Sequence, residues 1–142
     1  MIASWCASHL IVLAHQFAQK IMNKNASQLV NELAQFTGTQ HYYQISPYAM
    51  LTDGTKYLAQ EAGAYWLMDA IASYLPQFNG REEFIVAKLS VDYPEARLVL
   101  DNGNGRVLDR QYIEYTNFPL SNIQLYACWG GEYWVIMLTT EY

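Results

Sequence analysis

The chain has 142 residues, of which 52% are hydrophobic and 15% are charged, and its formal net charge is -5 at pH 7. This length fits one domain that buries about two thirds of its unfolded surface, and the surplus of apolar residues predicts a subunit or partner interface. The negative charge and the scattered basic residues argue against direct nucleic-acid binding, because phosphate-binding surfaces rely on clustered Lys and Arg. Its two cysteines, Cys6 and Cys128, lie far apart and form no CxxC pair, so we expect a cytoplasmic protein without a disulfide framework.

Residues 1–21 are expected to form a helical extension in front of a single α+β domain over residues 22–142. Apolar residues recur in this stretch at helical spacing, from Ile2 and Trp5 to Phe17 and Ile21. Polar residues interrupt every run of about 20 apolar residues, so no membrane span is expected. No Lys or Arg precedes Lys20, which argues against a secretory signal.

A second helix is predicted from Ala26 to Phe36. Asn25 is a suitable N-cap for it, and Gly38 suits its end. The following linker, Thr37 to Met50, is rich in tyrosine, and we expect it to be a loop that packs onto the domain.

The stretch from Thr52 to Tyr74 is predicted to be one long helix and the central element of the fold. Thr52 or Asp53 can cap its first turn, and Pro76 prevents its continuation. Its few polar side chains do not gather on one face, which predicts that other elements cover it on more than one side.

After Pro76 the pattern becomes alternating, and two hairpins can be placed in register. The first joins two strands through Asp92 to Glu95 and pairs Val91 with Ala96, Leu89 with Leu98, and Ala87 with Leu100. The second uses Gly130-Gly131 as a two-residue turn and pairs Ala127 with Trp134, Leu125 with Ile136, and Ile123 with Leu138. A middle strand, Arg106 to Tyr115, is expected to contain a bulge. The predicted fold is therefore α+β: a central helix packed on a curled five-stranded antiparallel meander, with two N-terminal helices.

Four sequence runs stand out: NELAQFTGTQHYY, LTDGTKYLAQEAGAYWLMDAIASY, LDNGNGRVLDRQYIEYTNFPL and the terminal TTEY. Together they resemble a family of small, single-domain proteins of unknown function from bacterial and phage genomes. The family carries no established activity or catalytic residues that could be transferred. The resemblance implies a protein that travels with mobile elements, for which interference with a host system is a reasonable role.

Asp69 is the strongest candidate for chemistry, because a carboxylate among apolar helical neighbours is costly to bury without a partner. Glu61 and Tyr65 lie on a neighbouring stripe of the predicted helix, so the three side chains could present two acids and a phenol to one pocket. The alternative is that Asp69 forms a hydrogen bond with a loop backbone and has a structural role only.

No metal or cofactor site is predicted. His9 and His15 are six residues apart, on different sides of a helix, and the Asp101 loop lacks the ligands of a calcium site. Cys128 has no base at a suitable spacing and is expected to be an inert thiol.

The abundance of aromatic residues favours a binding surface, since Tyr and Trp are frequent in binding hot spots. The last hairpin supplies the predicted binding residues, Tyr126, Trp129, Tyr133 and Met137. The leading hypothesis is a non-enzymatic protein-binding module that forms a homo-oligomer and inhibits a host defence or nucleic-acid-handling protein, in the manner of an anti-CRISPR protein. The alternatives are a small hydrolase or transferase that uses Asp69, Glu61 and Tyr65, and a small-molecule binding protein.

Overall fold

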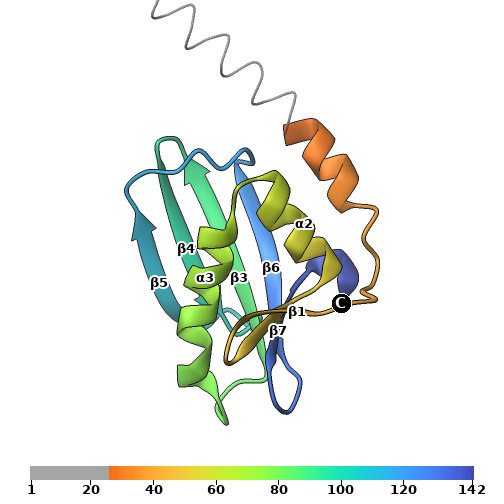
Figure 1. The fold of residues 1–142 in the computed structure, drawn as a ribbon. Helices are drawn as coiled ribbons and strands as arrows, with labels where there is room; N and C mark the ends of the chain where they lie inside the picture. Colours follow the sequence, from red (N-terminus) through yellow and green to blue (C-terminus); the bar gives the residue numbers. More distant parts are fainter. Residues whose placement is uncertain (1–25) are drawn as a thin grey trace, which may run out of the picture.

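A computed structural model describes residues 26–142, which form two layers: a seven-stranded sheet and a layer of helices (Figure 1). The expected N-terminal extension, residues 1–21, lies outside the described residues. Figure 1 shows α2 and α3 on the same face of the sheet. The strands are β1 (Tyr43–Ser46), β2 (Ala49–Leu51), β3 (Phe84–Asp92), β4 (Glu95–Asp101), β5 (Val107–Ile113), β6 (Asn122–Trp129) and β7 (Trp134–Leu138). The helices are a first one over 26–33, then α2 (Asp53–Glu61) and α3 (Tyr65–Tyr74), with short 3-10 turns η1 (Leu75–Phe78) and η2 (Thr139–Glu141).

The α+β class is confirmed, but the sheet has seven strands where five were predicted, in the order β1-β2-β7-β6-β3-β4-β5. The segment expected to be a packed loop contains the β1-β2 hairpin, in which the Tyr48 amide donates to the Ser46 hydroxyl, 3.1 Å away, across the turn. β2 then runs parallel to β7, whereas the other neighbouring strands are antiparallel.

The predicted meander order is wrong at one connection, because β6 pairs with β3 and not with β5. The chain between β5 and β6 returns across the end of the sheet, and Thr116, Phe118 and Leu120 are buried along it. Burial of the Phe118 and Leu120 side chains favours this return, which leads from the edge strand β5 to β6 in the interior of the sheet.

The register of the first hairpin is confirmed: Val91 pairs with Ala96, Leu89 with Leu98, and Ala87 with Leu100. The expected bulge is also present, since Leu100 pairs with Asp109 and the next residue, Asp101, pairs with Val107. Apolar residues at alternate positions therefore face the helices, as the sequence pattern predicted.

The register of the last hairpin is wrong by two residues. Trp129 pairs with Trp134 and Leu125 with Leu138, because the loop has four residues and not two. The Gly130 amide closes this loop with a hydrogen bond of 2.8 Å to the Tyr133 carbonyl, and Gly131 has a φ of 91°. Since side chains alternate with a period of two, a shift of two residues leaves every side chain on its predicted face.

The prediction of one long helix from Thr52 to Tyr74 is also wrong. The chain breaks between α2 and α3, where Gly63 has a φ of 59°, a left-handed conformation that favours glycine. The Ala64 amide bonds to the Ala59 carbonyl at 2.8 Å and turns the chain into α3. The two helices bury Leu58, Leu67 and Ile71 against the sheet, whereas Asp69 is exposed to solvent. Each helix thus has one solvated side, and the expectation of a helix covered all round does not hold.

Candidate functional site

The sheet face that points away from α2 and α3, called the outer face below, carries a cluster of apolar side chains. Phe84 pairs with Cys128 and Cys128 with Val135 in one row; Val86 pairs with Tyr126 and Tyr126 with Met137 in the next. Within residues 26–142, no helix lies over these two rows (Figure 1). This cluster, the apolar patch, consists of Phe84, Val86, Tyr126, Cys128, Val135 and Met137.

Three aromatic rings stand together on the apolar patch. The centroids of Phe84 and Tyr126 are 4.9 Å apart, and the ring of Tyr142 lies 5.5 Å from each of them. Tyr142 is 79% exposed, whereas Phe84 and Tyr126 are half-buried, so the group meets solvent mainly through the Tyr142 ring. Aromatic groups of this kind supply large contact area with little side-chain entropy to lose.

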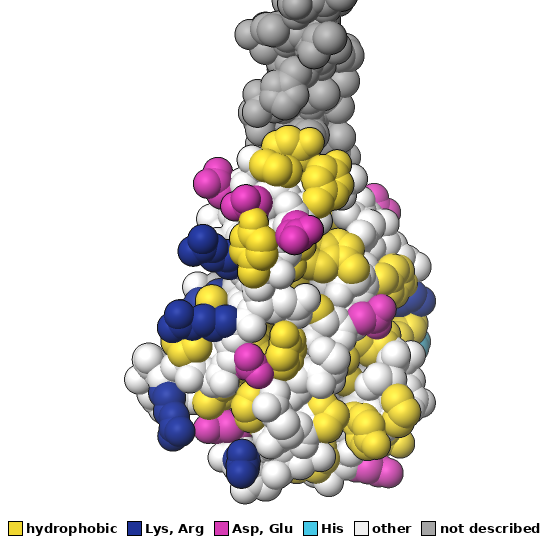
Figure 2. All heavy atoms as spheres, turned by 90° about the vertical axis from the view of Figure 1, so that its left-hand side faces the viewer, with side chains coloured by type: hydrophobic (Ala, Val, Ile, Leu, Met, Phe, Trp, Pro, Cys, Tyr) yellow, Lys and Arg dark blue, Asp and Glu magenta, His cyan; other side chains and the backbone are white. Residues whose placement is uncertain are grey.

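Next to the apolar patch, the same face carries basic side chains. Lys88, Val99 and Arg110 form one row across β3, β4 and β5, and Arg97 stands in the adjacent row beside Tyr112. We call Lys88, Arg97 and Arg110 the basic stripe. In Figure 2, which faces the β5 edge, most of the visible Lys and Arg side chains lie along the margin away from the helices. Carboxylates lie on the same face: Lys88 forms an ion pair of 2.9 Å with Asp101, and Glu95 accepts a hydrogen bond from the Tyr112 hydroxyl. The outer face therefore has an apolar half and a half in which both signs of charge are mixed.

Two of the four predicted binding residues, Tyr126 and Met137, lie in the apolar patch. Trp129 instead faces the helix layer, with its ring centroid 5.5 Å from that of the buried Trp134, and Tyr133 lies in the loop between β6 and β7. Sequence reasoning missed Phe84 and Val86, although their alternation with the inward-facing Ile85 was a usable signal. Only the pairing of β3 with β6 places them beside Tyr126.

The burial of Cys128 raises the pKa of its thiol. The neutral thiol is therefore favoured at neutral pH, which agrees with the expectation of a side chain that acts as a small apolar group.

A second cluster surrounds the N-terminus of α2. The Glu141 carboxylate accepts hydrogen bonds from the Thr52 hydroxyl (2.7 Å), the Leu138 amide (2.9 Å) and the Gly54 amide (3.1 Å). A Cβ atom on Gly54 would lie 2.5 Å from Glu141 Oε1, so a side chain has no room there. The terminal TTEY run thus holds the TDGT run through backbone and hydroxyl donors.

The segment TGTQHYY contacts the same helix at Asp53, the first residue of α2. The Asp53 carboxylate accepts hydrogen bonds from the Gln40 amide at 2.8 Å and from the Tyr43 hydroxyl at 3.0 Å, and His41 Nδ1 lies 3.7 Å from it. The hydrogen bond from Gln40 is the main cause that lowers the pKa of Asp53, and Asp53 in turn raises the pKa of Tyr43. Three of the runs that carry the family resemblance thus meet at the start of α2 and have a structural role there.

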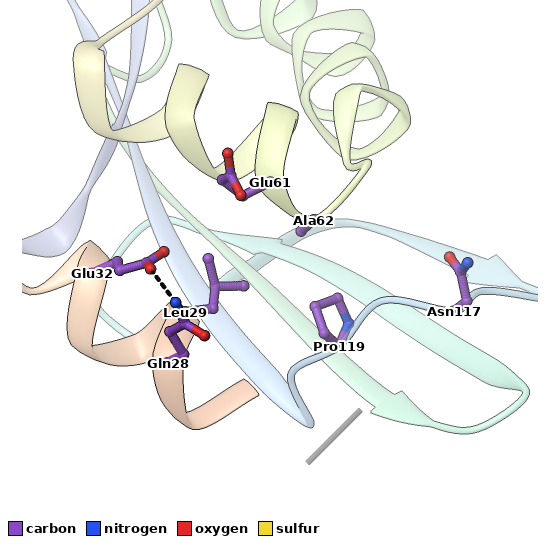
Figure 3. A pocket seen from close by; sticks show the side chains of 7 residues that line it. All are labelled: Gln28, Leu29, Glu32, Glu61, Ala62, Asn117 and Pro119. Carbon is purple, nitrogen blue, oxygen red and sulfur yellow. Dashed lines mark hydrogen bonds between the residues drawn. The ribbon is translucent and has the colours of Figure 1, made fainter. Parts of the chain in front are cut away.

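A cavity of about 410 Å³ separates the first helix, the C-terminal end of α2 and the loop before β6 (Figure 3). Gln28 donates to Glu32 at 2.9 Å, and the Tyr57 hydroxyl also donates to Glu32, which raises the pKa of Tyr57 to about 12. Glu61 borders the same cavity from α2. The arrangement offers carboxylate and amide oxygens to a ligand.

The catalytic alternative named Asp69, Glu61 and Tyr65. Glu61 borders this cavity, but Tyr65 and Asp69 lie on α3, beyond the break at Gly63, and do not line it. All three side chains are exposed.

Over residues 26–142, no group of three or more His, Cys, Asp or Glu side chains is arranged to hold a metal ion. None of the helices in this part of the chain is long and apolar enough to cross a membrane.

A comparison with known protein families shows which family the chain belongs to. The DUF6876 family model, described as a family of unknown function, matches residues 27–142. The chain belongs to DUF6876. No curated protein and no solved structure matches it. The DUF6876 region includes the apolar patch, the basic stripe, the α2 network and residues 27–33 of the first helix.

Proposed function

We propose that this DUF6876 chain is a non-enzymatic protein-binding module that contacts its partner through the outer face of the sheet. The observation that carries the proposal is the apolar patch, in which Phe84, Tyr126 and Met137 stand together without a covering helix among residues 26–142. A contiguous apolar surface rimmed by polar residues is typical of protein interaction sites. Aromatic and Met side chains are also enriched in such sites.

A narrower version of the proposal concerns the partner. The resemblance to proteins of bacterial and phage genomes supports a mobile-element product, and the target we propose is then a host defence or nucleic-acid-handling protein that the chain inhibits. The homo-oligomer prediction is a separate version, in which a second copy occupies the same face.

Site-specific cross-linking tests the proposal. A photoreactive phenylalanine analogue placed at Met137 should cross-link a protein partner in host cells, and mass spectrometry would identify it. The matched control carries the same analogue at Tyr65, which is exposed on α3. Cross-links from position 65 and none from position 137 would show that the outer face is not the contact surface.

Identification should be followed by a binding measurement with the purified partner. Replacing Met137 by Glu places a charge in the apolar patch and should weaken binding by at least about 2 kcal/mol, the loss typical of a hot spot. Tyr65→Glu should leave the affinity unchanged. Circular dichroism on both variants would separate a loss of contact from a loss of fold.

The cavity beside Glu32 and Glu61 favours a second candidate function, the binding of a small cationic molecule. Two carboxylates from different helices border one cavity, and a ligand amine could bind both. A thermal-shift panel of primary amines tests this: stabilisation should be seen for the parent chain and lost on Glu61→Gln. No stabilisation by any amine would exclude this function for the compounds of the panel.

A further inference from the structure

We infer that an uncharged groove between the first helix and the start of β6 is the docking site of residues 1–21 of the same chain. The occupant is thus the chain's own N-terminal stretch, folded back onto the domain. This surface differs from the outer face, and the inference does not rest on the proposed function.

The groove exists because β7 ends before β6 does. Leu125 pairs with Leu138, the last residue of β7, whereas residues 122–124 of β6 pair only with β3. The first helix and the turn that ends it form the opposite wall, with Val30 and Ala34. The space between these elements has a volume of about 260 Å³. We call it the β6 groove.

The lining of the β6 groove is mainly apolar. Val30, on the wall, is 53% exposed. The polar lining residues are Asn, Gln and Thr, so among residues 26–142 no charged side chain lines the groove. The cavity of Figure 3, beside the same helix, differs because Glu32 and Glu61 border it. An occupant of the β6 groove must therefore present apolar, uncharged side chains. The apolar lining residues are Val30, Leu33, Ala34, Leu120, Ile123 and Leu138.

The sequence of residues 1–21 has the matching composition. It contains no Asp or Glu, and its only Lys or Arg is Lys20. Leu10, Leu13, Phe17 and Ile21 recur at helical spacing and would form one apolar stripe on a helix. Burial of such a stripe in an uncharged groove is favourable, because apolar surface leaves water and no charge is desolvated.

The point of attachment places this segment beside the groove. A shallow depression continues from the β6 groove to the start of the first helix, where Ala26 and Ser27 line it together with Val30. Residues 22–25 alone separate Ile21 from Ala26, and a connection of this length is typical of antiparallel neighbouring helices. Such a tether gives the segment an effective concentration of about millimolar at the groove, so a weak contact is sufficient.

The lengths of the two elements also agree. The first helix, over 26–33, is about 12 Å long, and residues 10–21 would span about 17 Å as a helix. In an antiparallel arrangement, Phe17 and Ile21 would lie near Val30. Leu10 and Leu13 would lie near Thr140, which borders the β6 groove but not the depression at the start of the first helix.

Photo-cross-linking in the full chain tests this placement. A benzoylphenylalanine in place of Val30 should link to residues 17–21, and one in place of Thr140 should link to residues 10–13. Mass spectrometry on an equal mixture of unlabelled and isotope-labelled protein shows whether a link joins residues of one chain or of two. Tyr65, which is exposed on α3, is the control position and should give no link to residues 1–21.

Substitutions in the segment connect these links to its apolar stripe. Leu13→Glu/Phe17→Glu should lower the yield of both links at least about tenfold, because a charge buried without a partner is costly. The matched control, Ser8→Glu/Gln19→Glu, adds the same two charges on the opposite side of the predicted helix and should leave both yields unchanged. Circular dichroism would show that both variants keep the fold.

The other outcomes would overturn the inference. Links between labelled and unlabelled chains would show that a second copy fills the groove, and links from position 30 to another protein in host cells, without links to residues 1–21, would show a foreign occupant. Links from Met137 to residues 1–21 would place the segment on the outer face. Absence of the intramolecular links, or equal yields from the parent and Leu13→Glu/Phe17→Glu, would show that the stripe does not dock. A protein partner cross-linked from Met137 supports the proposed function and leaves this inference unchanged.

Discussion

At the scale of single residues, Glu141 has the clearest structural role. Its carboxylate accepts three hydrogen bonds, two of them from Thr52 and Gly54 at the start of α2. A carboxylate at this position satisfies amides that the first turn of a helix leaves free and interacts favourably with the helix dipole. The same contacts tie the C-terminal turn to Gly54 in the first turn of α2, 87 residues earlier in sequence.

Glu141→Ala should therefore destabilise the fold by about 1–3 kcal/mol, the cost of leaving these donors without an acceptor. Urea denaturation followed by circular dichroism measures this loss. Glu132→Ala is the matched control, because Glu132 is exposed in the loop between β6 and β7, and it should change the stability by less than about 0.5 kcal/mol. Equal effects of the two substitutions would show that the capping contacts contribute nothing.

Asp53 gives a prediction about pH. Its hydrogen bond with the Gln40 amide lowers the pKa of the folded state below the usual Asp value of about 3.9. The folded state therefore binds fewer protons than the unfolded state in this range, and the stabilisation is complete above the unfolded pKa and lost as pH falls through the folded pKa. Asp53→Asn should be less stable than the parent at neutral pH, and the difference should shrink below about pH 4. Urea unfolding over a pH series measures it; a constant difference down to about pH 3 contradicts the assignment.

At the scale of elements, the break between α2 and α3 decides which side chains of the helix layer reach solvent. Gly63 ends α2 with a φ of 59°, and no atom lies within 4 Å of the position that its Cβ would occupy. Space is therefore available, and the conformation alone disfavours a side chain. The break also separates Glu61, at the cavity, from Tyr65 and Asp69 on α3.

Gly63→Ala should destabilise the fold by about 1 kcal/mol, because L-residues rarely adopt this left-handed conformation. A continuous helix would give the opposite sign, since Ala is the better helix former. Gly38→Ala is the control: this glycine also has free space and has no positive φ, so the substitution should be neutral or slightly stabilising. Chemical denaturation of the two variants measures the change in unfolding free energy. A loss of stability in Gly63→Ala supports the left-handed break, and a gain would support a continuous helix.

The same elements show how far sequence reasoning extends. The β3-β4 register was predictable, because the alternation of Leu89 and Leu98 and a short connection determine it locally. The outward position of Tyr126 and Met137 was also predictable, because it depends on the alternation along each strand and is unchanged by the register error of two residues. The break at Gly63 was not predicted, since glycine is compatible with both a helix and a left-handed turn. The apolar patch depends on the pairing of β3 with β6, and such a non-local pairing leaves no signal in a local pattern.

At the scale of the whole molecule, the two edges of the sheet are poor sites for association. β1 has four residues and an irregular register with β2, and short or bulged edge strands resist pairing with another chain. β5 carries Asp109 on the face toward the helices, where Gln77 donates to it at 3.3 Å, and an inward-pointing charge has the same protective effect. Pairing of this sheet with another chain through its edges is thus disfavoured.

Strand order also predicts where the fold is most resistant to opening. β6 lies between β7 and β3 and contributes the buried Leu125 and Ala127, whereas β1 and β5 each have one neighbour. Amides of central strands exchange mainly through global unfolding, and amides at edges exchange through local opening. Hydrogen exchange followed by mass spectrometry should therefore show the slowest exchange in β3 and β6 and faster exchange in β1 and β5.

Since Lys88 lies on β3 and Arg110 on β5, the basic stripe would then join the most rigid part of the sheet to its mobile edge. A partner that binds the stripe should slow exchange in β5 more than in β6, because only β5 has local opening to lose. Equal protection of β5 and β6 in the free chain would contradict this picture.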